Sequence, residues 1–352
     1  MLIFVEYKWN ASYMKIEHIN GLVAAPFTPM KPDGSLNLEL IPTYYQILKS
    51  AGVVGAFVCG STGEGPSLTF KEKMLMIKAW ADCAKKGDDF KIIPLLGGTC
   101  ISECVELAQY AAAAGVHGVS ITAPYYFKIG SVDTLAEICR TVAGSIPSTP
   151  FYYYHIPVLT GVDFQMISLL ERVDDIPNFA GIKYTHEDFM DFLSCLNYKD
   201  NTYDMLWGRD ENLLSALVLG AKGGVGSTYN YAAPLYHDLI TLYNQGKPEA
   251  AQKKQQQSID MIRLLGKYGG IATGKAYMKL MGLDCGEFRL PVKNMSAAQF
   301  ESFKRDVDHL TSKAFVRQFL LHIVLLNSCI AYGKQQPCLC AGKYKRFTAL
   351  VN

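Results

Sequence analysis

The 352-residue sequence has almost no excess of either charge. It carries 34 lysines and arginines against 32 aspartates and glutamates, a formal net charge of +2. Proteins that bind nucleic acids or anionic membranes usually have a strong basic excess, so we expect neither partner. The sequence also lacks an apolar run of about 18 residues, the length that a membrane-spanning helix needs. With 49% hydrophobic and 19% charged residues, its composition is that of an ordinary globular protein.

The ten cysteines show no zinc-ligand spacing, and no two of them form a C-x-x-C motif. Most lie inside apolar runs, where a free cysteine behaves as a small hydrophobic side chain. Met1–Val5 is shorter than the apolar region of a signal peptide, and charged residues follow it. We therefore expect no metal site, reduced thiols and a cytoplasmic protein, since ten cysteines in a secreted chain would favour disulfides.

Short apolar or β-branched runs recur about every 29 residues, and a helical pattern follows each. This spacing fits one strand plus one crossover helix per unit. The expected strands are Gly21–Thr28, Gly55–Gly60, Lys91–Gly98, Gly118–Pro124, Phe151–His155, Phe179–Thr185, Asp204–Asp210 and Gly223–Thr228. These units predict an α/β protein with a closed (β/α)8 TIM barrel. An open doubly wound sheet is the alternative, but it usually has fewer strands, and no G-x-G-x-x-G motif follows the first one.

The barrel is expected over residues 19–245, after an N-terminal extension of residues 1–18. Further helical patterns follow and predict a C-terminal helical appendage over residues 246–313. These patterns are Pro248–Lys267, Thr273–Met281 and Ser296–Ser312. Residues 314–352 fit neither part, and we expect them to form an atypical C-terminal tail.

Local signals predict several helix starts. Thr69 and Glu72 form a capping box, in which two side chains bond to free backbone amides of the first turn. Asp163 is expected to be the N-cap of the helix that follows it. Pro42 favours a helix that begins at its own position rather than at Asn37, because proline fits the first turn.

Lys183 is the residue that most strongly suggests chemistry. Side chains alternate along a strand, so Phe179, Gly181 and Lys183 are expected on one face, either inside the barrel or against the outer helices. Both places are dry, and a buried lysine is costly unless it is neutral, paired or functional. A neutral amine can attack a carbonyl and form a Schiff base. The alternative is a lysine that reaches an acidic loop residue at the strand end.

Other polar residues stand at strand ends, where TIM-barrel active sites lie. Tyr154 lies on the strand beside that of the lysine and could relay a proton. Gly60–Gly63 offers amides and two hydroxyls for a carboxylate or phosphate, unless it is only a tight turn. Asp210 and Glu211 could bind hydroxyls, could hold a metal, or could belong to an acidic surface loop; we favour hydroxyls. His155 lies on the opposite strand face from Tyr154 and is expected to be structural.

Four motifs, in the right order along one expected barrel, resemble the pyruvate-dependent class I aldolases. This is the family of dihydrodipicolinate synthase and N-acetylneuraminate lyase. The motifs are Gly60–Glu64 (GSTGE), Tyr154–Pro157 (YHIP), Gly181–Thr185 (GIKYT) and Gly226–Asn230 (GSTYN). The resemblance covers about residues 19–289. It implies a TIM barrel, a covalent Schiff base on Lys183 with no other cofactor, and a homotetramer.

The resemblance also implies roles for individual residues. Lys183 would form the Schiff base with pyruvate, and Tyr154 would carry the proton that makes or breaks the carbon–carbon bond. Ser61 and Thr62, with their backbone amides, would hold the pyruvate carboxylate. Tyr126 would reach into the active site of a neighbouring subunit.

The residues expected around the second substrate resemble those of the family's sialic acid lyases. Gly208 begins their Gly-x-Asp-Glu pattern, in which Asp210 and Glu211, together with Ser227, would bind the glycerol-like chain of the sugar. Thr185 would lie near the reacting C4 hydroxyl. The implied reaction is the reversible cleavage of N-acetylneuraminate (sialic acid) to N-acetyl-D-mannosamine and pyruvate.

Two alternatives stay open at this point. One is another pyruvate aldolase, either dihydrodipicolinate synthase-like or acting on a sugar acid or 4-hydroxy-2-oxoglutarate. However, Leu159 stands where dihydrodipicolinate synthases usually carry an arginine for a substrate carboxylate. The other is a catalytically silent sugar-binding barrel, which loss of Lys183 or Tyr154 would indicate, and both are present. His155 and Arg209 depart from the bacterial lyase pattern, although YHIP looks like the animal form.

Overall fold

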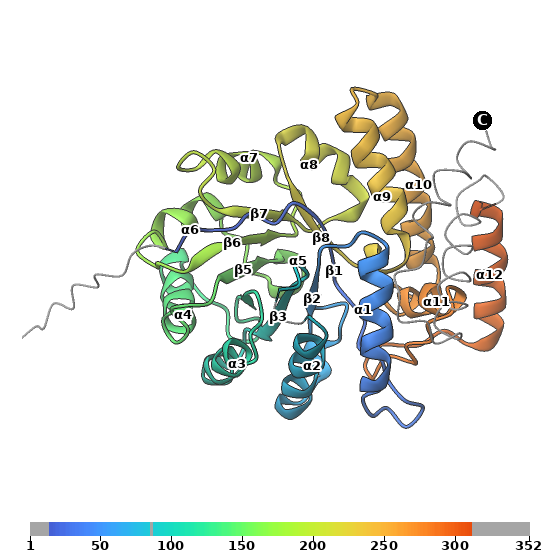
Figure 1. Cartoon of the computed structure of the whole chain (residues 1–352), viewed down its shortest axis with the longest axis horizontal. Helices are drawn as coiled ribbons and strands as arrows, with labels where there is room; N and C mark the ends of the chain where they lie inside the picture. Colours follow the sequence, from blue (N-terminus) through green and yellow to red (C-terminus); the bar gives the residue numbers. More distant parts are fainter. Residues whose placement is uncertain (1–13, 85–86, 312–352) are drawn as a thin grey trace, which may run out of the picture.

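The computed structural model describes residues 14–84 and 87–311, in which parallel strands close into a barrel surrounded by helices (Figure 1). The strands are β1 (Gly21–Ala24), β2 (Gly55–Val58), β3 (Lys91–Gly97), β4 (Val119–Thr122), β5 (Phe151–His155), β6 (Phe179–Tyr184), β7 (Asp204–Trp207) and β8 (Gly223–Gly226). Each strand pairs with the next along the chain, and β8 pairs with β1. The predicted TIM barrel is confirmed, and the open-sheet alternative is wrong because the sheet closes on itself.

Helices connect the strands and then continue beyond the barrel. Between and directly after the strands lie α1 (Ile41–Ser50), α2 (Phe70–Cys83), α3 (Ile101–Ala113), α4 (Val132–Gly144), α5 (Pro157–Thr160), α6 (Met166–Arg172), α7 (Phe189–Asn197), α8 (Leu213–Leu219) and α9 (Tyr229–Asn244). Short 3₁₀ turns are η1 (Leu38–Leu40), η2 (Gly65–Ser67) and η3 (Asp210–Asn212). The helices that follow are α10 (Pro248–Lys267), α11 (Ala272–Leu280) and α12 (Ala297–Thr311).

The helices after the barrel form the predicted appendage, which gathers beside α9 (Figure 1). α10 packs along α9, and α12 packs on α10. Aromatic side chains join these layers, since Tyr277 of α11 stacks on Tyr231 of α9 and contacts Phe303 of α12. The domain boundaries that we expect stay predictions, and the tail from residue 314 lies outside the described residues.

Two hydrophobic cores position the strands. A smaller core fills the inside of the barrel, and a larger one lies between the strands and the helices. The inner core includes Val23, Phe57, Ile93, Leu95, Tyr152, Tyr154, Leu206 and Val225. Because the strands are buried on both faces, they appear in the sequence as nearly continuous apolar runs.

Strand β6 departs from the alternation that the sequence predicts. Phe179 pairs with Phe151 of β5, but the next β5 residue, Tyr152, pairs with Gly181, so Ala180 is an extra residue in the strand. This irregularity resembles a β-bulge, which shifts the side chains that follow it by one position. Phe179 therefore packs in the outer core, whereas Lys183 faces the inside, and the prediction that they share one face is wrong.

Two of the three predicted helix starts are confirmed, and one is wrong. The capping box is confirmed, because Glu72 N donates to Thr69 Oγ1 and the Glu72 carboxylate accepts from Thr69 N. Pro42 lies in the first turn of α1, as expected. The assignment of Asp163 as an N-cap is wrong, since α6 begins later, at Met166.

A long-range contact replaces the missing cap of α6. The buried carboxylate of Asp191, on α7, accepts hydrogen bonds from Met166 N at 2.8 Å and Ile167 N at 3.0 Å. These amides belong to the first turn, whose donors need partners from outside the helix. Among residues 14–84 and 87–311, no helix is long and apolar enough to span a membrane.

Candidate active site

Lys183 lies inside the barrel, near the C-terminal ends of the strands. Its side chain comes from β6 and is only 4% exposed. Lys183 Nζ lies 3.9 Å from the ring centres of both Phe57 and Tyr154. Within the described part of the chain, no carboxylate lies at ion-pair distance from this nitrogen. The alternative of a lysine that reaches an acidic loop residue therefore does not describe Lys183.

The environment of Lys183 favours a neutral amine. Burial lowers the pKa of Lys183 to about 7, because a dry site disfavours the ammonium form, while the negative charge of Asp210 acts in the opposite direction. A substantial fraction of the amine is then unprotonated near pH 7, whereas an ordinary lysine, with a pKa of about 10.4, is almost fully charged. The site therefore supplies what nucleophilic attack on a carbonyl requires.

Tyr154 stands directly opposite Lys183 in the sheet. The two residues are paired in the register of β5 and β6. Burial raises the pKa of Tyr154 to about 12, while the neighbouring hydroxyls of Ser61 and Thr185 lower it. The phenol is therefore protonated at neutral pH and can act as a proton donor. The structure thus brings together four of the predicted site residues.

The Gly60–Gly63 segment forms a tight loop at the end of β2. Glu64 N donates to Ser61 O at 3.2 Å, and Gly65 N donates to Gly60 O at 3.1 Å. Gly65 has no room for a side chain, because a Cβ there would lie 1.9 Å from Cys59 O. Ser61 remains partly exposed at the mouth of the barrel, whereas Thr62 is buried.

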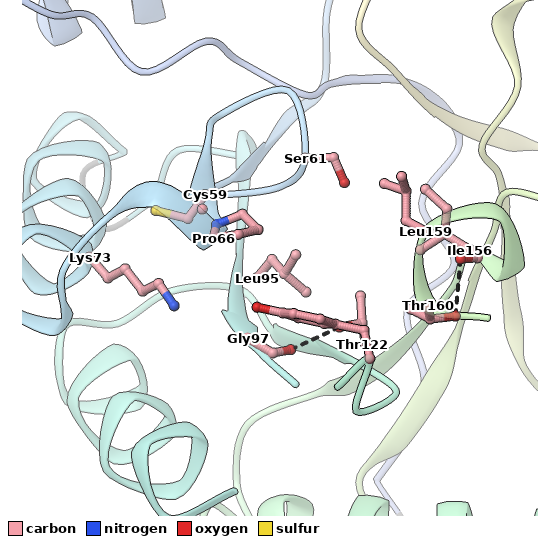
Figure 2. Close-up of a pocket in the computed structure, with 12 residues that line it drawn as sticks. Cys59, Ser61, Pro66, Lys73, Leu95, Gly97, Thr122, Ile156, Leu159 and Thr160 are labelled. Carbon is pink, nitrogen blue, oxygen red and sulfur yellow. Dashed lines mark hydrogen bonds between the residues drawn. The ribbon is translucent and has the colours of Figure 1, made fainter. Parts of the chain in front are cut away.

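A small cleft opens beside this loop, with a volume of about 80 Å³ (Figure 2). Ser61, Thr122, Ile156 and Leu159, which come from three different strand ends, are among the side chains that line it. Lys73 of α2 also lines the cleft, and its Nζ donates to Leu96 O at 3.0 Å. Sequence reasoning missed Lys73, because nothing in its local pattern distinguishes it from a surface lysine of an amphipathic helix.

Asp210 lies in the turn η3 that follows β7. Its buried carboxylate accepts hydrogen bonds from Thr228 N at 2.8 Å and Thr228 Oγ1 at 2.5 Å. Burial raises the pKa of Asp210 to about 6, although the Thr228 bonds and the charge of Lys183 lower it. Gly226 is needed here, since a Cβ would lie 1.9 Å from the carboxylate.

Glu211 and Gly208 occupy different surroundings from Asp210. Glu211 pairs with the guanidinium of Arg209, which also pairs with Glu187. Gly208 lets the chain pass Thr185, because a Cβ would lie 1.9 Å from Thr185 Oγ1. Three of the predicted sugar-site residues, Thr185, Gly208 and Asp210, therefore lie together, whereas Glu211 is held by an ion pair.

The remaining predicted site residues, Ser227 and Tyr126, lie after β8 and after β4. Ser227 is partly exposed after β8, and its carbonyl accepts a hydrogen bond from Asn230 Nδ2 at 2.7 Å. Tyr126 is 75% exposed, and its ring centre lies 5.1 Å from that of Phe127. The structure of one chain therefore does not bring Tyr126 into the site.

His155 lies on the strand face opposite Tyr154, as expected, but neither of its ring nitrogens has a hydrogen-bond partner among the described residues. It packs against the rings of Tyr153, Tyr184 and His186. Burial lowers the pKa of His155 to about 3, so the ring is neutral and takes no charge in the physiological range. Its position away from Lys183 fits a structural role.

The described residues contain no group of three histidines, cysteines, aspartates or glutamates arranged to hold a metal ion. The described cysteines are all free thiols. Burial raises the pKa of several of them, Cys59 and Cys104 to about 12, so these are not reactive thiolates.

Comparison with known proteins decides the family. The model of the "Dihydrodipicolinate synthetase family" matches residues 18–310. The chain belongs to the dihydrodipicolinate synthetase family. N-acetylneuraminate lyase of Mus musculus is 37% identical over 302 residues, which cover 84% of this chain and 94% of the mouse protein. The Gallus gallus N-acetylneuraminate lyase is 39% identical over 283 residues, covering 79% of this chain and 92% of that protein.

A solved structure extends the similarity to three dimensions. N-acetylneuraminate lyase of Proteus mirabilis superposes with a TM-score of 0.81 at 36% identity, covering 84% of this chain and 99% of the other. The matched range includes Lys183, Tyr154 and the loops at the barrel mouth, so this member of the dihydrodipicolinate synthetase family spans nearly the full length of its relatives.

Proposed function

We propose that this protein is an N-acetylneuraminate lyase, a carbon–carbon lyase that reversibly cleaves sialic acid into N-acetyl-D-mannosamine and pyruvate. The observation that carries the proposal is the amine of Lys183, held in a dry barrel with a pKa of about 7 beside the Tyr154 ring. The similarity to N-acetylneuraminate lyases over most of the chain supports the substrate.

The geometry supports a Schiff-base mechanism. Neutral Lys183 attacks the C2 carbonyl of open-chain sialic acid, and loss of water gives an imine. When the C3–C4 bond breaks, its electron pair moves into the imine to form an enamine, and the C4 hydroxyl becomes the aldehyde of N-acetylmannosamine. Tyr154 relays the proton of that hydroxyl. Protonation of the enamine at C3 and hydrolysis then release pyruvate and regenerate the amine, so no metal or organic cofactor takes part.

The mouth of the barrel supplies two kinds of binding group. Ser61 and Thr62, on the loop after β2, hold the pyruvate carboxylate through hydroxyls and backbone amides. Around the sugar, the polar groups of Thr185, Gly208, Asp210, Glu211 and Ser227 bind the C4 hydroxyl and the glycerol-like chain. Carboxylates that accept hydrogen bonds from a polyol favour substrates that carry those hydroxyls.

We also propose that the protein is a homotetramer and that it is cytoplasmic. An exposed apolar surface supports assembly into an oligomer. Tyr125, Tyr126 and Phe127 follow β4, and Val158 and Leu159 lie on α5, all of them large apolar side chains exposed near the barrel mouth. A monomer rarely leaves such side chains together in water. In the assembly, Tyr126 completes the active site of a neighbouring subunit.

Trapping with pyruvate tests the proposed chemistry. Incubation with pyruvate and sodium borohydride should add a reduced pyruvyl group to Lys183, located by mass spectrometry of peptides, and omission of pyruvate should prevent it. The Lys183→Ala variant should form no adduct and lose all turnover. An unmodified Lys183 in the wild-type protein would contradict the mechanism. Pyruvate release assayed across sialic acids and short sugar acids then decides between sialic acid cleavage and another pyruvate aldolase.

A further inference from the structure

A buried ion pair ties the loop after β2 to the helical appendage. Glu64, the residue that follows Gly63, has both carboxylate oxygens occupied by groups from the end of the described chain. Glu64 Oε1 accepts from Lys275 Nζ of α11 at 2.8 Å, and Glu64 Oε2 accepts from Arg289 N at 2.8 Å. The two ionic side chains are 2% and 3% exposed. None of these atoms lines the cleft at Ser61.

The backbone of Glu64 is unusual for a residue with a side chain. Its φ of 58° lies in the left-handed region, where a residue with a side chain is strained. Glycine would adopt this turn without strain. A glutamate is therefore not required by the turn itself, and the contacts of its carboxylate are what distinguish it from the less strained residue.

The ion pair is also an expensive way to gain stability. Taking two charges out of water carries a large desolvation cost, and well-packed apolar residues often stabilise a fold as well or better. Lys275 Nζ has a further partner, Glu287 O at 2.9 Å, so the ammonium is held from two sides. The ion pair of Glu64 and Lys275 is therefore better explained by a role in positioning the turn than by a contribution to stability.

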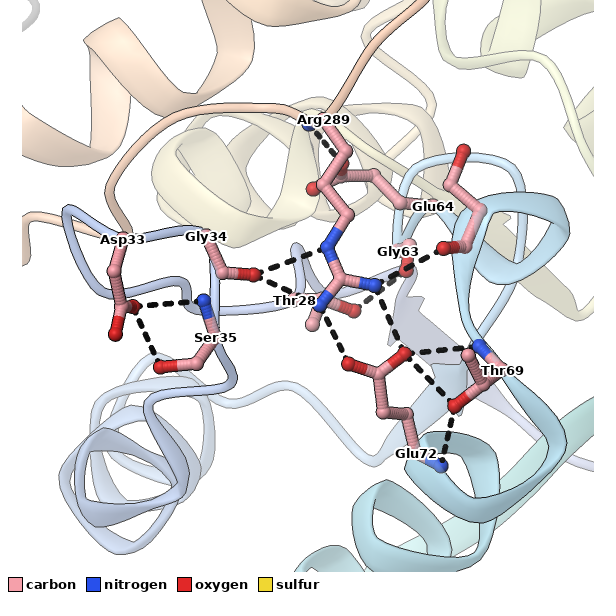
Figure 3. A network of polar contacts seen from close by, with 10 residues as sticks. Thr28, Asp33, Gly34, Ser35, Gly63, Glu64, Thr69, Glu72 and Arg289 are labelled. Atoms are coloured by element: carbon pink, nitrogen blue, oxygen red, sulfur yellow. Dashed lines mark hydrogen bonds and ion pairs between the residues drawn. The ribbon is translucent and has the colours of Figure 1, made fainter.

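Arg289 holds the other end of the same loop (Figure 3). Its guanidinium binds both carboxylate oxygens of Glu72, at 2.5 and 2.9 Å, and donates to Ser67 O at 3.1 Å and to Gly34 O at 2.8 Å. Glu72 in turn caps the start of α2. The chain from Glu64 to Glu72 is therefore fixed to the appendage at both of its ends.

We propose that Glu64 and Lys275 are positioning residues, which act through the turn to hold Ser61 and Thr62 where they bind the pyruvate carboxylate. Ser61 lies three residues before Glu64, and Ser61 O accepts the Glu64 amide of that turn. A change in the turn would therefore move the backbone that carries the Ser61 hydroxyl. This inference rests on the proposed aldolase function, and it gives the appendage a part in substrate binding.

The experiment measures the pyruvate concentration at which borohydride trapping of Lys183 is half-maximal, together with the melting temperature. Glu64→Gln and Lys275→Met should each raise this concentration about tenfold or more, since small misplacements of binding groups have such effects. The adduct should still form on Lys183 at saturating pyruvate. Lys275→Arg keeps the charge and should recover most of the affinity.

Asp174→Asn is the matched control. Asp174 lies far along the chain from the loop and accepts hydrogen bonds from Tyr198, Tyr203 and Lys199. Its loss should lower the melting temperature without changing the pyruvate dependence. If Glu64→Gln and Lys275→Met also lower only the melting temperature, the positioning role is wrong and the ion pair is structural.

The wild-type protein separates the two proposals. A wild-type chain that forms no adduct overturns the aldolase function and the positioning role with it. A wild-type chain that forms the adduct, with variants that bind pyruvate equally well, overturns the positioning role alone. If Lys275→Met does not fold, Glu64→Gln, which keeps a hydrogen-bonding side chain of the same size, decides the question.

Discussion

Tyr154 and Lys183 are directly paired across β5 and β6, and the lysine nitrogen lies 3.9 Å from the centre of the tyrosine ring. The amine lies over the π surface of the ring. Because the phenol keeps its proton at neutral pH, the two residues do not form an ion pair. A cation over an aromatic face is stabilised, yet burial is the largest influence on the amine and lowers its pKa. The pair thus joins an amine with a lowered pKa to a phenol that keeps its proton at neutral pH.

The pH dependence of trapping should reveal this amine. Lys183 is protonated below its pKa of about 7 and neutral above it, so the rate of adduct formation should rise as the pH increases through about 7. An unperturbed lysine would show this rise near pH 10.4. The initial rate of cyanoborohydride-dependent labelling with pyruvate, measured between pH 5 and 10, checks the prediction. A rate that still increases steeply above pH 9 would show that the pKa is not lowered.

The Tyr154→Phe variant should separate binding of pyruvate from cleavage. Without the phenol, proton transfer at the C4 hydroxyl loses its relay, so kcat should fall by about 10²–10⁴-fold. The adduct on Lys183 should still form. Tyr153→Phe is a matched control on the same strand, because Tyr153 packs in the outer core. Equal losses in both variants would mean that the effect comes from packing.

The Leu159→Arg variant should harm sialic acid cleavage. Leu159 lines the cleft beside Ser61 and is 59% exposed, so an arginine there can be accommodated without unfolding the barrel. Dihydrodipicolinate synthases, which bind a second substrate carboxylate, usually carry an arginine at this position. Because N-acetylneuraminate would meet a new charge there, its kcat/KM should fall about tenfold or more. Leu159→Met should retain the activity. An unchanged kcat/KM in the Leu159→Arg variant would mean that the sugar binds elsewhere in the barrel mouth.

Asp204 should make the fold less stable as the pH rises. Burial raises the pKa of Asp204 to about 7, although Ile19 N and the Tyr152 hydroxyl donate to its carboxylate and lower the pKa. Between pH 4 and 7 the folded protein binds this proton more tightly than the unfolded chain does. The free energy of unfolding should therefore fall across this window, by at most about 4 kcal/mol.

The Asp204→Asn variant provides the comparison. Its side chain cannot ionise, so this contribution to the pH dependence should be absent. Urea unfolding of both proteins at several pH values between 4 and 8 measures the difference. Parallel curves for wild type and variant would show that Asp204 ionises as readily in the folded protein as in the unfolded chain.

The barrel could be predicted because its signals are local. Strands that are buried on both faces form apolar runs, and the expected strands coincide with the observed ones. The observed strands often end earlier, β1 at Ala24 and β7 at Trp207, since the last residues of each run belong to the loops of the site. Lys183 and Tyr154 could be placed side by side because consecutive strands of a barrel are neighbours.

Other features depend on contacts between distant parts of the chain. The extra residue at Ala180 follows from how β5 and β6 fit together, and no pattern within β6 marks it. Asp163 has the right type and spacing for an N-cap, but Asp191 takes that role. The partners of Glu64 and the ion pair of Glu211 with Arg209 were likewise missed, because side-chain pairing is decided by packing.

The groups of the appendage that hold the β2 loop are synthesised after the barrel. Lys275 and Arg289 lie 211 and 225 residues after Glu64, so a ribosome makes all eight strands before it makes the groups that hold the β2 loop. Contacts over such separations form late, because closing a long loop costs chain entropy. A nascent or truncated chain that ends at α9 would contain the lysine, the tyrosine and the barrel strands, yet lack the fixed loop. If Glu64 and Lys275 position the loop as proposed, full pyruvate binding requires the appendage as well as the barrel.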